Sequence, residues 1–142
     1  MEVLQTIFTI LIAILVFGLL IFIHELGHFL AAKRMGIRVN EFAIGMGPTL
    51  LKKQGKETKY SLRALPFGGF CAMEGENDDS ETEGSYFTKP AWRKIVVIIA
   101  GPFMNLLLGF VLLLALNIFA GSAEFGTTEV KSFIEGDRKS VV

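Results

Sequence analysis

The chain has 142 residues, enough for one ordinary domain, and 51% of them are hydrophobic. That share, a mean hydropathy of +0.51 and thirteen phenylalanines are typical of a membrane protein rather than a soluble one. The formal net charge is zero, so charge gives no reason to expect nucleic acid as a partner. The single cysteine, Cys71, excludes an internal disulfide and is expected to be a small buried apolar residue.

The first expected element is a membrane-spanning helix over residues 1–34. The run from Val3 to Ile23 carries no charge, and it exceeds the ~20 residues that a spanning helix needs. A cleavable signal peptide is the competing interpretation. The segment opens without Lys or Arg, its apolar run is too long and no small-residue cleavage site follows, so we favour the spanning helix.

The end of this helix carries the motif H-E-x-x-H, formed by His24, Glu25 and His28. Histidines four residues apart lie on one face of a helix, where two imidazole nitrogens can bind one zinc ion and the glutamate can act as general base. Counted from Lys33 at ~1.5 Å per residue, the motif lies about 13 Å inside the membrane, where polar groups are costly. The alternative is a pair of neutral histidines bonded to another helix, with Glu25 protonated or reaching toward the cytoplasmic face.

Residues 35–91 are expected to form a loop that contains a small β-hairpin or meander. Short β-type runs at 40–48 and 58–73 are interrupted by glycine and proline, and they hold too many apolar side chains for a solvated loop. A β-loop that enters the membrane beside the zinc helix fits this pattern. A small β-subdomain on the membrane surface is the alternative. A free strand edge here could hold a substrate in an extended form.

A second spanning helix is expected over residues 92–123. It contains the uncharged run from Ile95 to Ala123, and Trp92 with the two cations that follow it is a typical interfacial anchor. Pro102 is expected near the start of this helix, where proline is tolerated. Asn105 is expected to hydrogen-bond either to a neighbouring helix or to a bound substrate.

The distribution of cations predicts the orientation in the membrane. Eleven of the fourteen Lys and Arg residues lie in residues 31–94, and the first thirty residues have none. The positive-inside rule therefore places the loop 35–91 in the cytoplasm and both termini outside. The polar stretch 77–85 suits an exposed connection.

Four motifs in order resemble the bacterial site-2 proteases, and the nearest match is the regulator of sigma-E protease type. The motifs are HELGH in the first span, AIGMGP and LPFGGF in the loop, and AGPFMN in the second span. The resemblance covers residues 1 to about 136 and implies zinc-dependent cleavage of single-pass membrane proteins in or near their transmembrane segments, in regulated intramembrane proteolysis. Anti-sigma factors and remnant signal peptides are typical substrates. It implies His24 and His28 as zinc ligands, Glu25 as catalytic base, and a substrate-binding set that comprises Gly45, Gly47, Gly68, Gly69 and Asn105.

The same resemblance implies parts that this sequence does not contain. The third zinc ligand of the family is an aspartate in a later helix, within an L-D-G pattern, and Asp78, Asp79 and Asp137 do not match it. Residues 124–136 resemble only the start of a PDZ-like domain. The tail 137–142, DRKSVV, is expected to be non-native because it matches a translated sequencing adapter. The chain is therefore expected to be an N-terminal fragment, inactive or nearly so without the C-terminal part of the same protein.

Sequence analysis thus predicts an α-helical integral membrane protein of a bacterial inner membrane, a zinc intramembrane endopeptidase that works in the lipid bilayer. The alternative is a non-catalytic module, a pseudoprotease that captures transmembrane helices by the same loop. An intact Glu25 argues against it, because capture needs no general base. A soluble zinc protease tethered by a signal anchor is excluded by the position of the motif within the apolar run.

Overall fold

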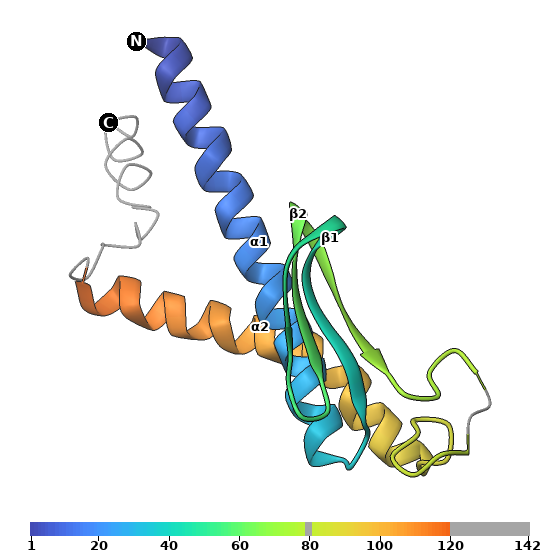
Figure 1. Cartoon of the computed structure of the whole chain (residues 1–142). Helices are drawn as coiled ribbons and strands as arrows, with labels where there is room; N and C mark the ends of the chain where they lie inside the picture. Colours follow the sequence, from blue (N-terminus) through green and yellow to red (C-terminus); the bar gives the residue numbers. More distant parts are fainter. Residues whose placement is uncertain (79–80, 120–142) are drawn as a thin grey trace, which may run out of the picture. The chain divides into compact units, whose positions relative to one another are not determined.

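The computed structural model describes residues 1–78 and 81–119. They form two helices and two strands in the order α1 (Glu2–Arg34), β1 (Val39–Gln54), β2 (Lys59–Met73) and α2 (Ala91–Phe119) (Figure 1). The chain divides into two compact units, Met1–Gly109 and Phe110–Val142. The first unit holds α1, the hairpin and α2 up to Gly109. Of the second unit, the structure describes residues 110–119, which continue α2.

Helix α1 covers the predicted apolar run and ends at the cations that follow it. Glu2 lies in its first turn and Lys33 and Arg34 in its last, so both ends carry the charge that the helix dipole favours. Gly36, at φ +70°, follows the end of the helix and lets the chain turn back. Most large apolar side chains in the first half of α1 are exposed. Both α1 and α2 are long and apolar enough to cross a membrane.

The position of Pro102 in α2 corrects the prediction. The helix begins at Ala91, so Pro102 lies inside it and not near its start. The predicted start at residue 92 is one residue from the observed start, but the expectation for Pro102 overlooked residues 91–99, which precede AGPFMN in the helix. Proline has no N–H for the carbonyl of Ile98 and its ring crowds that carbonyl, which loosens the hydrogen-bond ladder of α2 at this level.

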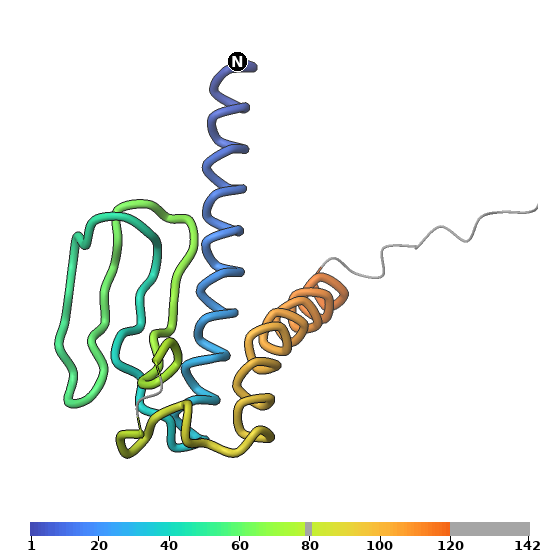
Figure 2. Tube along the Cα trace, turned by 90° about the vertical axis from the view of Figure 1, so that its right-hand side faces the viewer, coloured from blue at the N-terminus to red at the C-terminus, as the bar shows by residue number. Residues whose placement is uncertain are grey.

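Within the first unit, α2 crosses α1 closely at glycine. A Cβ atom added to Gly27 would overlap the backbone carbonyl of Ala100, and it would lie 2.9 Å from the Cγ atom of Met104. Only glycine therefore allows this approach of the two backbones. Figure 2 shows α1 between the hairpin on one side and the beginning of α2 on the other. This close crossing brings side chains of α1 within reach of the α2 backbone.

Strands β1 and β2 form an antiparallel two-stranded sheet. Residues 41–44 of β1 have partners on two sides, at 69–72 and at 59–62 of β2, while residues 51–54 pair with 59–62. The hairpin thus folds over on itself, and its first segment lies between the two ends of β2. The segment 69–72 pairs with β1 alone among the described residues and runs beside α1.

The predicted hairpin is confirmed, but Gly45 and Gly47 lie within a strand and not at its end as the sequence suggested. Gly45 and Gly47 have φ of +84° and +83° and lie inside β1, where the pairing register shifts. They bend a continuous strand and do not end it. The connection between the strands lies at 55–58, where the N–H of Gly55 donates to the carbonyl of Thr58 at 3.0 Å. Strand β1 is therefore longer than the predicted run 40–48.

A small apolar core lies where the end of α1, the start of the hairpin and the start of α2 meet. Tyr86 and several other half-buried residues pack around it. The core includes Cys71, as predicted. Its fully or nearly buried members are Ala32, Ile37, Val39, Phe42, Cys71 and Val97.

The architecture confirms two long apolar helices joined by a segment with a small β-hairpin. The predicted start of a PDZ-like domain at 124–136 and the tail 137–142 lie outside the described residues. The connection 77–85 is mostly exposed where described, although Ser85 is fully buried. Membrane crossing and its direction stay predictions.

One half-buried carboxylate ties the hairpin together. Glu41 accepts hydrogen bonds from the Ser61 hydroxyl at 2.6 Å, from Nζ of Lys59 at 2.9 Å and from Nη2 of Arg63 at 3.2 Å. The Ser61 bond and the two cations lower the pKa of Glu41 from 4.5 to about 2, against the opposing effect of burial. Since the carboxylate is bound only in the folded hairpin, its ionised form stabilises the fold.

We expect Glu41 to make the hairpin sensitive to acid. Because its pKa is lower in the folded chain, its contribution is complete above pH 4.5 and disappears as the pH falls toward 2. The contribution is at most about 3 kcal/mol. Thermal unfolding of the detergent-solubilised chain should show a loss of stability over this range that is clearly smaller in Glu41→Gln. Equal pH dependence in the two proteins would contradict this assignment.

Candidate metal centre

The two histidines of the motif face each other on one side of α1. Their ring centroids are 4.8 Å apart at an interplanar angle of 78°, and their Nε2 atoms are separated by 3.1 Å. Two imidazole nitrogens bound to one tetrahedral zinc at 2.0–2.1 Å lie about 3.3 Å apart. The spacing of the two Nε2 atoms is therefore close to that of two ligands of a single ion.

The backbone of α2 orients His28. Its Nδ1 atom lies 2.8 Å from the carbonyl oxygen of Val97, and a carbonyl only accepts hydrogen bonds. Nδ1 of His28 therefore carries the proton, which leaves a lone pair on Nε2. This is the tautomer that a metal-binding histidine needs, and a backbone carbonyl is a common partner for the other ring nitrogen.

Asn105 of α2 contacts the other histidine. Its Nδ2 atom lies 3.3 Å from Nδ1 of His24. An amide nitrogen only donates, so Nδ1 of His24 accepts this bond and its Nε2 carries the proton, which it donates to Nε2 of His28. The four groups thus form a chain of hydrogen bonds from the Asn105 amide through both rings to the backbone of Val97.

Gly101 lets the backbone of α2 lie against the two Nε2 atoms. A Cβ atom built on Gly101 would overlap the His28 ring at Nε2 and lie 2.9 Å from Nε2 of His24. Any larger residue would therefore displace the two rings. The spacing of the rings and the tautomer of His28 fit a zinc ion.

The described residues supply fewer ligands than a catalytic zinc takes. Such an ion normally has three protein ligands and a water, and no group of three or more His, Cys, Asp or Glu side chains suited to a metal occurs in residues 1–78 and 81–119. Cys71 lies nearby, but burial raises the pKa of its thiol to about 12, with a smaller effect from Glu25. The thiol is therefore protonated at neutral pH.

Glu25 is the residue of the motif that faces the hairpin. A Cβ atom on Gly69 would come within 3.1 Å of Cγ of Glu25 and 2.9 Å of the carbonyl of Ala43, so a larger residue would push the strand from the helix. Gly69 thereby lets the segment 69–72 of β2 pass directly beside the carboxylate. The side chain of Glu25 and the edge of a strand thus lie side by side.

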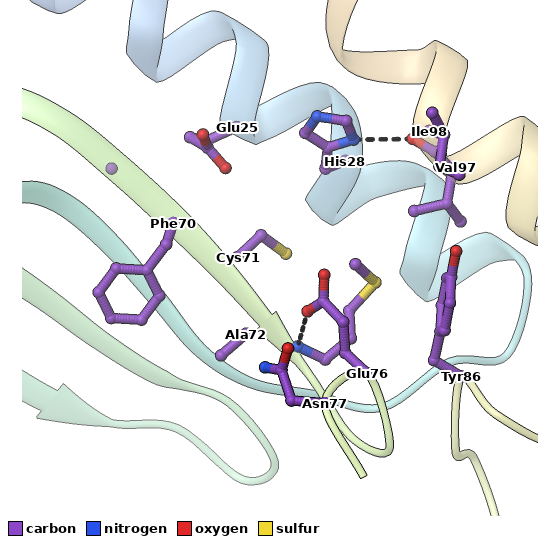
Figure 3. Close-up of a pocket in the computed structure, with 12 residues that line it drawn as sticks. Glu25, His28, Phe70, Cys71, Ala72, Glu76, Asn77, Tyr86, Val97 and Ile98 are labelled. Carbon is purple, nitrogen blue, oxygen red and sulfur yellow. Dashed lines mark hydrogen bonds between the residues drawn. The ribbon is translucent and has the colours of Figure 1, made fainter. Parts of the chain in front are cut away.

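Two cavities meet at this point. One has a volume of about 570 Å³ and extends from Glu25 and His28 along Phe70, Cys71 and Ala72 toward Glu76 and Tyr86 (Figure 3). In this view Glu25 and His28 project from α1, and the three strand residues come from β2. The other has a volume of about 430 Å³ and lies on the side of His24, Gly68 and Asn105. Glu25 and Gly69 line both cavities.

The structure brings together most of the predicted site. His24, Glu25, His28, Gly68, Gly69 and Asn105 all line one or both cavities. Gly45 and Gly47 line neither, and they lie across the hairpin near Leu65. The substrate-binding role of these glycines and of Asn105 stays a prediction.

Sequence analysis missed Gly101 and the Val97 carbonyl. A Gly-Pro pair was visible in AGPFMN, but its proximity to the histidines depends on the crossing of α1 and α2. The signal for Gly101 is a small residue one helical turn before Asn105 in a span that must approach the motif. No sequence signal marks a backbone carbonyl such as that of Val97.

Comparison with known proteins places this geometry in a family. The model of peptidase family M50 matches residues 12–141. Three relatives, each named "putative zinc metalloprotease", come from Clostridium acetobutylicum, Fusobacterium nucleatum and Thermotoga maritima. Their identities to this chain are 51%, 45% and 39%, over 82%, 86% and 82% of its length.

The aligned regions are 34%, 36% and 24% of those relatives, so the chain spans about a third or less of their length. The family match covers most of the chain, including both helices and the hairpin from residue 12 on. It confirms the resemblance to the site-2 proteases that the four motifs indicated. This chain belongs to peptidase family M50.

Proposed function

We propose that the chain carries the zinc-binding histidines, the general base and a substrate-binding strand of a membrane-embedded zinc endopeptidase. The observation that carries the proposal is the pair of Nε2 atoms 3.1 Å apart on an apolar helix, with Glu25 beside them against the hairpin. The names of the relatives, zinc metalloproteases, agree with this assignment.

His24 and His28 would hold the ion through Nε2, and the third protein ligand comes from outside the described residues. Zinc in such a site supplies Lewis-acid chemistry, which activates water and polarises a carbonyl. Glu25 takes the proton from the attacking water and returns it to the leaving amine. The described residues alone supply too few ligands for efficient hydrolysis.

The substrate is a transmembrane segment of a single-pass protein, such as an anti-sigma factor or a remnant signal peptide. Peptide bonds in a helix are covered by their own hydrogen bonds, so the segment must be extended before it can be cut. The segment 69–72 has a free side beside Glu25 and can pair with an extended chain. The cavity along Phe70 and Ala72 offers room for that chain.

The arrangement in the membrane follows from charge. With α1 and α2 as spans, the positive-inside rule places residues 35–91 in the cytoplasm and both ends of the chain outside. Many apolar side chains of the hairpin are exposed, including Leu51, Leu65 and Phe67, as expected for a β-loop that contacts lipid or protein within the membrane. The partners are the bilayer, the substrate and the remaining part of the same protein.

Gly101→Ala should weaken metal binding. The new methyl group would overlap the His28 ring and crowd Nε2 of His24, which would push the two rings out of position, so we expect zinc affinity to fall more than about tenfold. Affinity can be measured by competition with a chelator in detergent. Gly109→Ala is the matched control, because no atom lies within 4 Å of its added Cβ. Wild-type affinity in Gly101→Ala would place the ion elsewhere.

Glu25→Gln should abolish peptide hydrolysis and leave zinc binding intact, because the amide cannot accept the proton. We would measure cleavage of a single-pass substrate in liposomes by a chimera in which this chain replaces the aligned part of the Clostridium acetobutylicum relative. A loss of about 100-fold or more in rate is expected, the usual contribution of general acid–base catalysis.

Zinc removal by a chelator should abolish cleavage by the same chimera, and added zinc should restore it. A chimera that binds zinc and substrate but cleaves no substrate would favour the capture module over the protease. Cleavage by Glu25→Gln at the rate of the parent would remove Glu25 from the mechanism.

Binding to the strand edge should show a period of two residues in the substrate. In a β-strand alternate N–H groups face the same neighbour, so N-methylation of every second residue near the scissile bond should slow cleavage while the intervening positions tolerate it. The chimera and a set of singly N-methylated peptides would test this. Uniform tolerance at all positions would contradict pairing with 69–72.

A further inference from the structure

Only one of the two polar atoms in the Asn105 side-chain amide has a hydrogen-bond partner among the described residues. Its Nδ2 atom bonds to Nδ1 of His24 at 3.3 Å, while its Oδ1 atom is buried and has no hydrogen-bond partner among the described residues. A buried carbonyl without a partner destabilises the fold. The amide could meet its neighbours in another orientation, because half a turn about its last bond exchanges the two atoms without moving the rest of the side chain.

The present orientation prevents His24 from binding a metal through Nε2. With Nδ2 of Asn105 donating to Nδ1, the ring proton of His24 lies on Nε2, where it bonds to Nε2 of His28. A metal ligand needs a lone pair at that atom. His28 already has one, because Val97 holds its proton on Nδ1. Only His24 must move its proton before both rings can bind the same ion.

We propose that Asn105 is a positioning residue that sets the tautomer of His24 and thereby decides whether the site accepts zinc. In the metal-free chain its Nδ2 atom donates to His24, and the two histidines bond to each other. When zinc binds, the amide turns, Oδ1 accepts the proton of His24 at Nδ1, and both Nε2 atoms face the ion. The inference rests on the proposed zinc site and adds the residue that switches it.

One orientation of the amide fits the metal-free state and the other fits the zinc-bound state. In the turned form, Oδ1 gains the partner that it lacks now. Asn105 lines the cavity beside His24 and Glu25, and water or a substrate carbonyl in this cavity is the acceptor that we propose for the turned amide nitrogen. An asparagine can do this because it has a donor and an acceptor of equal size, which leucine and aspartate do not.

A purely structural role for Asn105 makes different predictions. If it only joins α2 to α1, an isosteric apolar residue would cost some stability and leave the histidine protons and the metal affinity unchanged. Leucine has nearly the same shape and no polar atom, so Asn105→Leu tests that role. Asn105→Asp keeps the acceptor and removes the donor, so it favours the tautomer with the proton on Nδ1.

The first measurement is the position of the His24 proton in the metal-free chain. Imidazole nitrogen chemical shifts in detergent at about pH 8.5, two units above the ordinary histidine pKa of about 6.5, distinguish the two neutral tautomers. We expect the proton on Nε2 in the wild-type chain and on Nδ1 in Asn105→Asp. His28 is the internal reference, since its proton should remain on Nδ1 in every variant.

The second measurement is zinc affinity by chelator competition. Loss of a partner to a ligating histidine typically costs 10–100-fold in metal affinity, so we expect Asn105→Leu to bind zinc about 10–100-fold more weakly than the wild type. Asn105→Asp should bind at least as tightly. Asn117→Leu is the matched control, because Asn117 lies about three turns further along α2 and its amide bonds to the carbonyl of Leu113 in its own helix.

The outcomes separate this inference from the zinc assignment. A His24 proton that stays on Nε2 in Asn105→Asp, or wild-type zinc affinity in a folded Asn105→Leu, would overturn the role of Asn105 and leave the metal site standing. If the wild-type chain binds no zinc while Asn105→Asp still moves the proton, the control of the tautomer stands and the zinc assignment falls. Proton movement together with weaker zinc binding in Asn105→Leu would establish both.

Discussion

The close crossing of α1 and α2 is the constraint on which the site depends. At Gly27 and Gly101 the two helices leave no room for side chains, so the backbone of one lies against the rings on the other. The motif residues all belong to α1, yet the proton of His28 is held by a carbonyl of α2. A helix with the motif alone would expose two histidines of undefined tautomer. The second helix contacts Nδ1 of both rings and so defines their tautomers.

The sequence predicts well that the two histidines face each other, because their spacing is a local property. Four residues make about one turn of a helix, so His24 and His28 must lie on the same face wherever the helix packs. Glu25 follows from the same motif. What the sequence cannot predict is which backbone carbonyl meets a ring, or that Gly101 lies against both Nε2 atoms, because both depend on how two separate helices cross.

The hairpin was predictable in kind but not in detail. Alternating apolar and polar residues between glycines indicate strands, yet glycine and proline mark either a turn or a bend within a strand. In β1 the glycine marks a bend and not a turn, because Gly45 adopts φ +84° and the strand continues after it. The choice depends on pairing with β2 and on Gly69, whose missing side chain lets the strand pass beside Glu25. Those contacts join residues far apart in the chain.

An apolar setting explains why the polar groups of this site form one connected chain. Each donor and acceptor away from water must find a partner, so a change at one group alters its neighbours. The proton of His28 is held by a backbone carbonyl and cannot easily move. The proton of His24 depends on the Asn105 amide, which has both a donor and an acceptor. The variable end of the chain is therefore Asn105. Control over the metal site lies on the helix that carries none of its ligands.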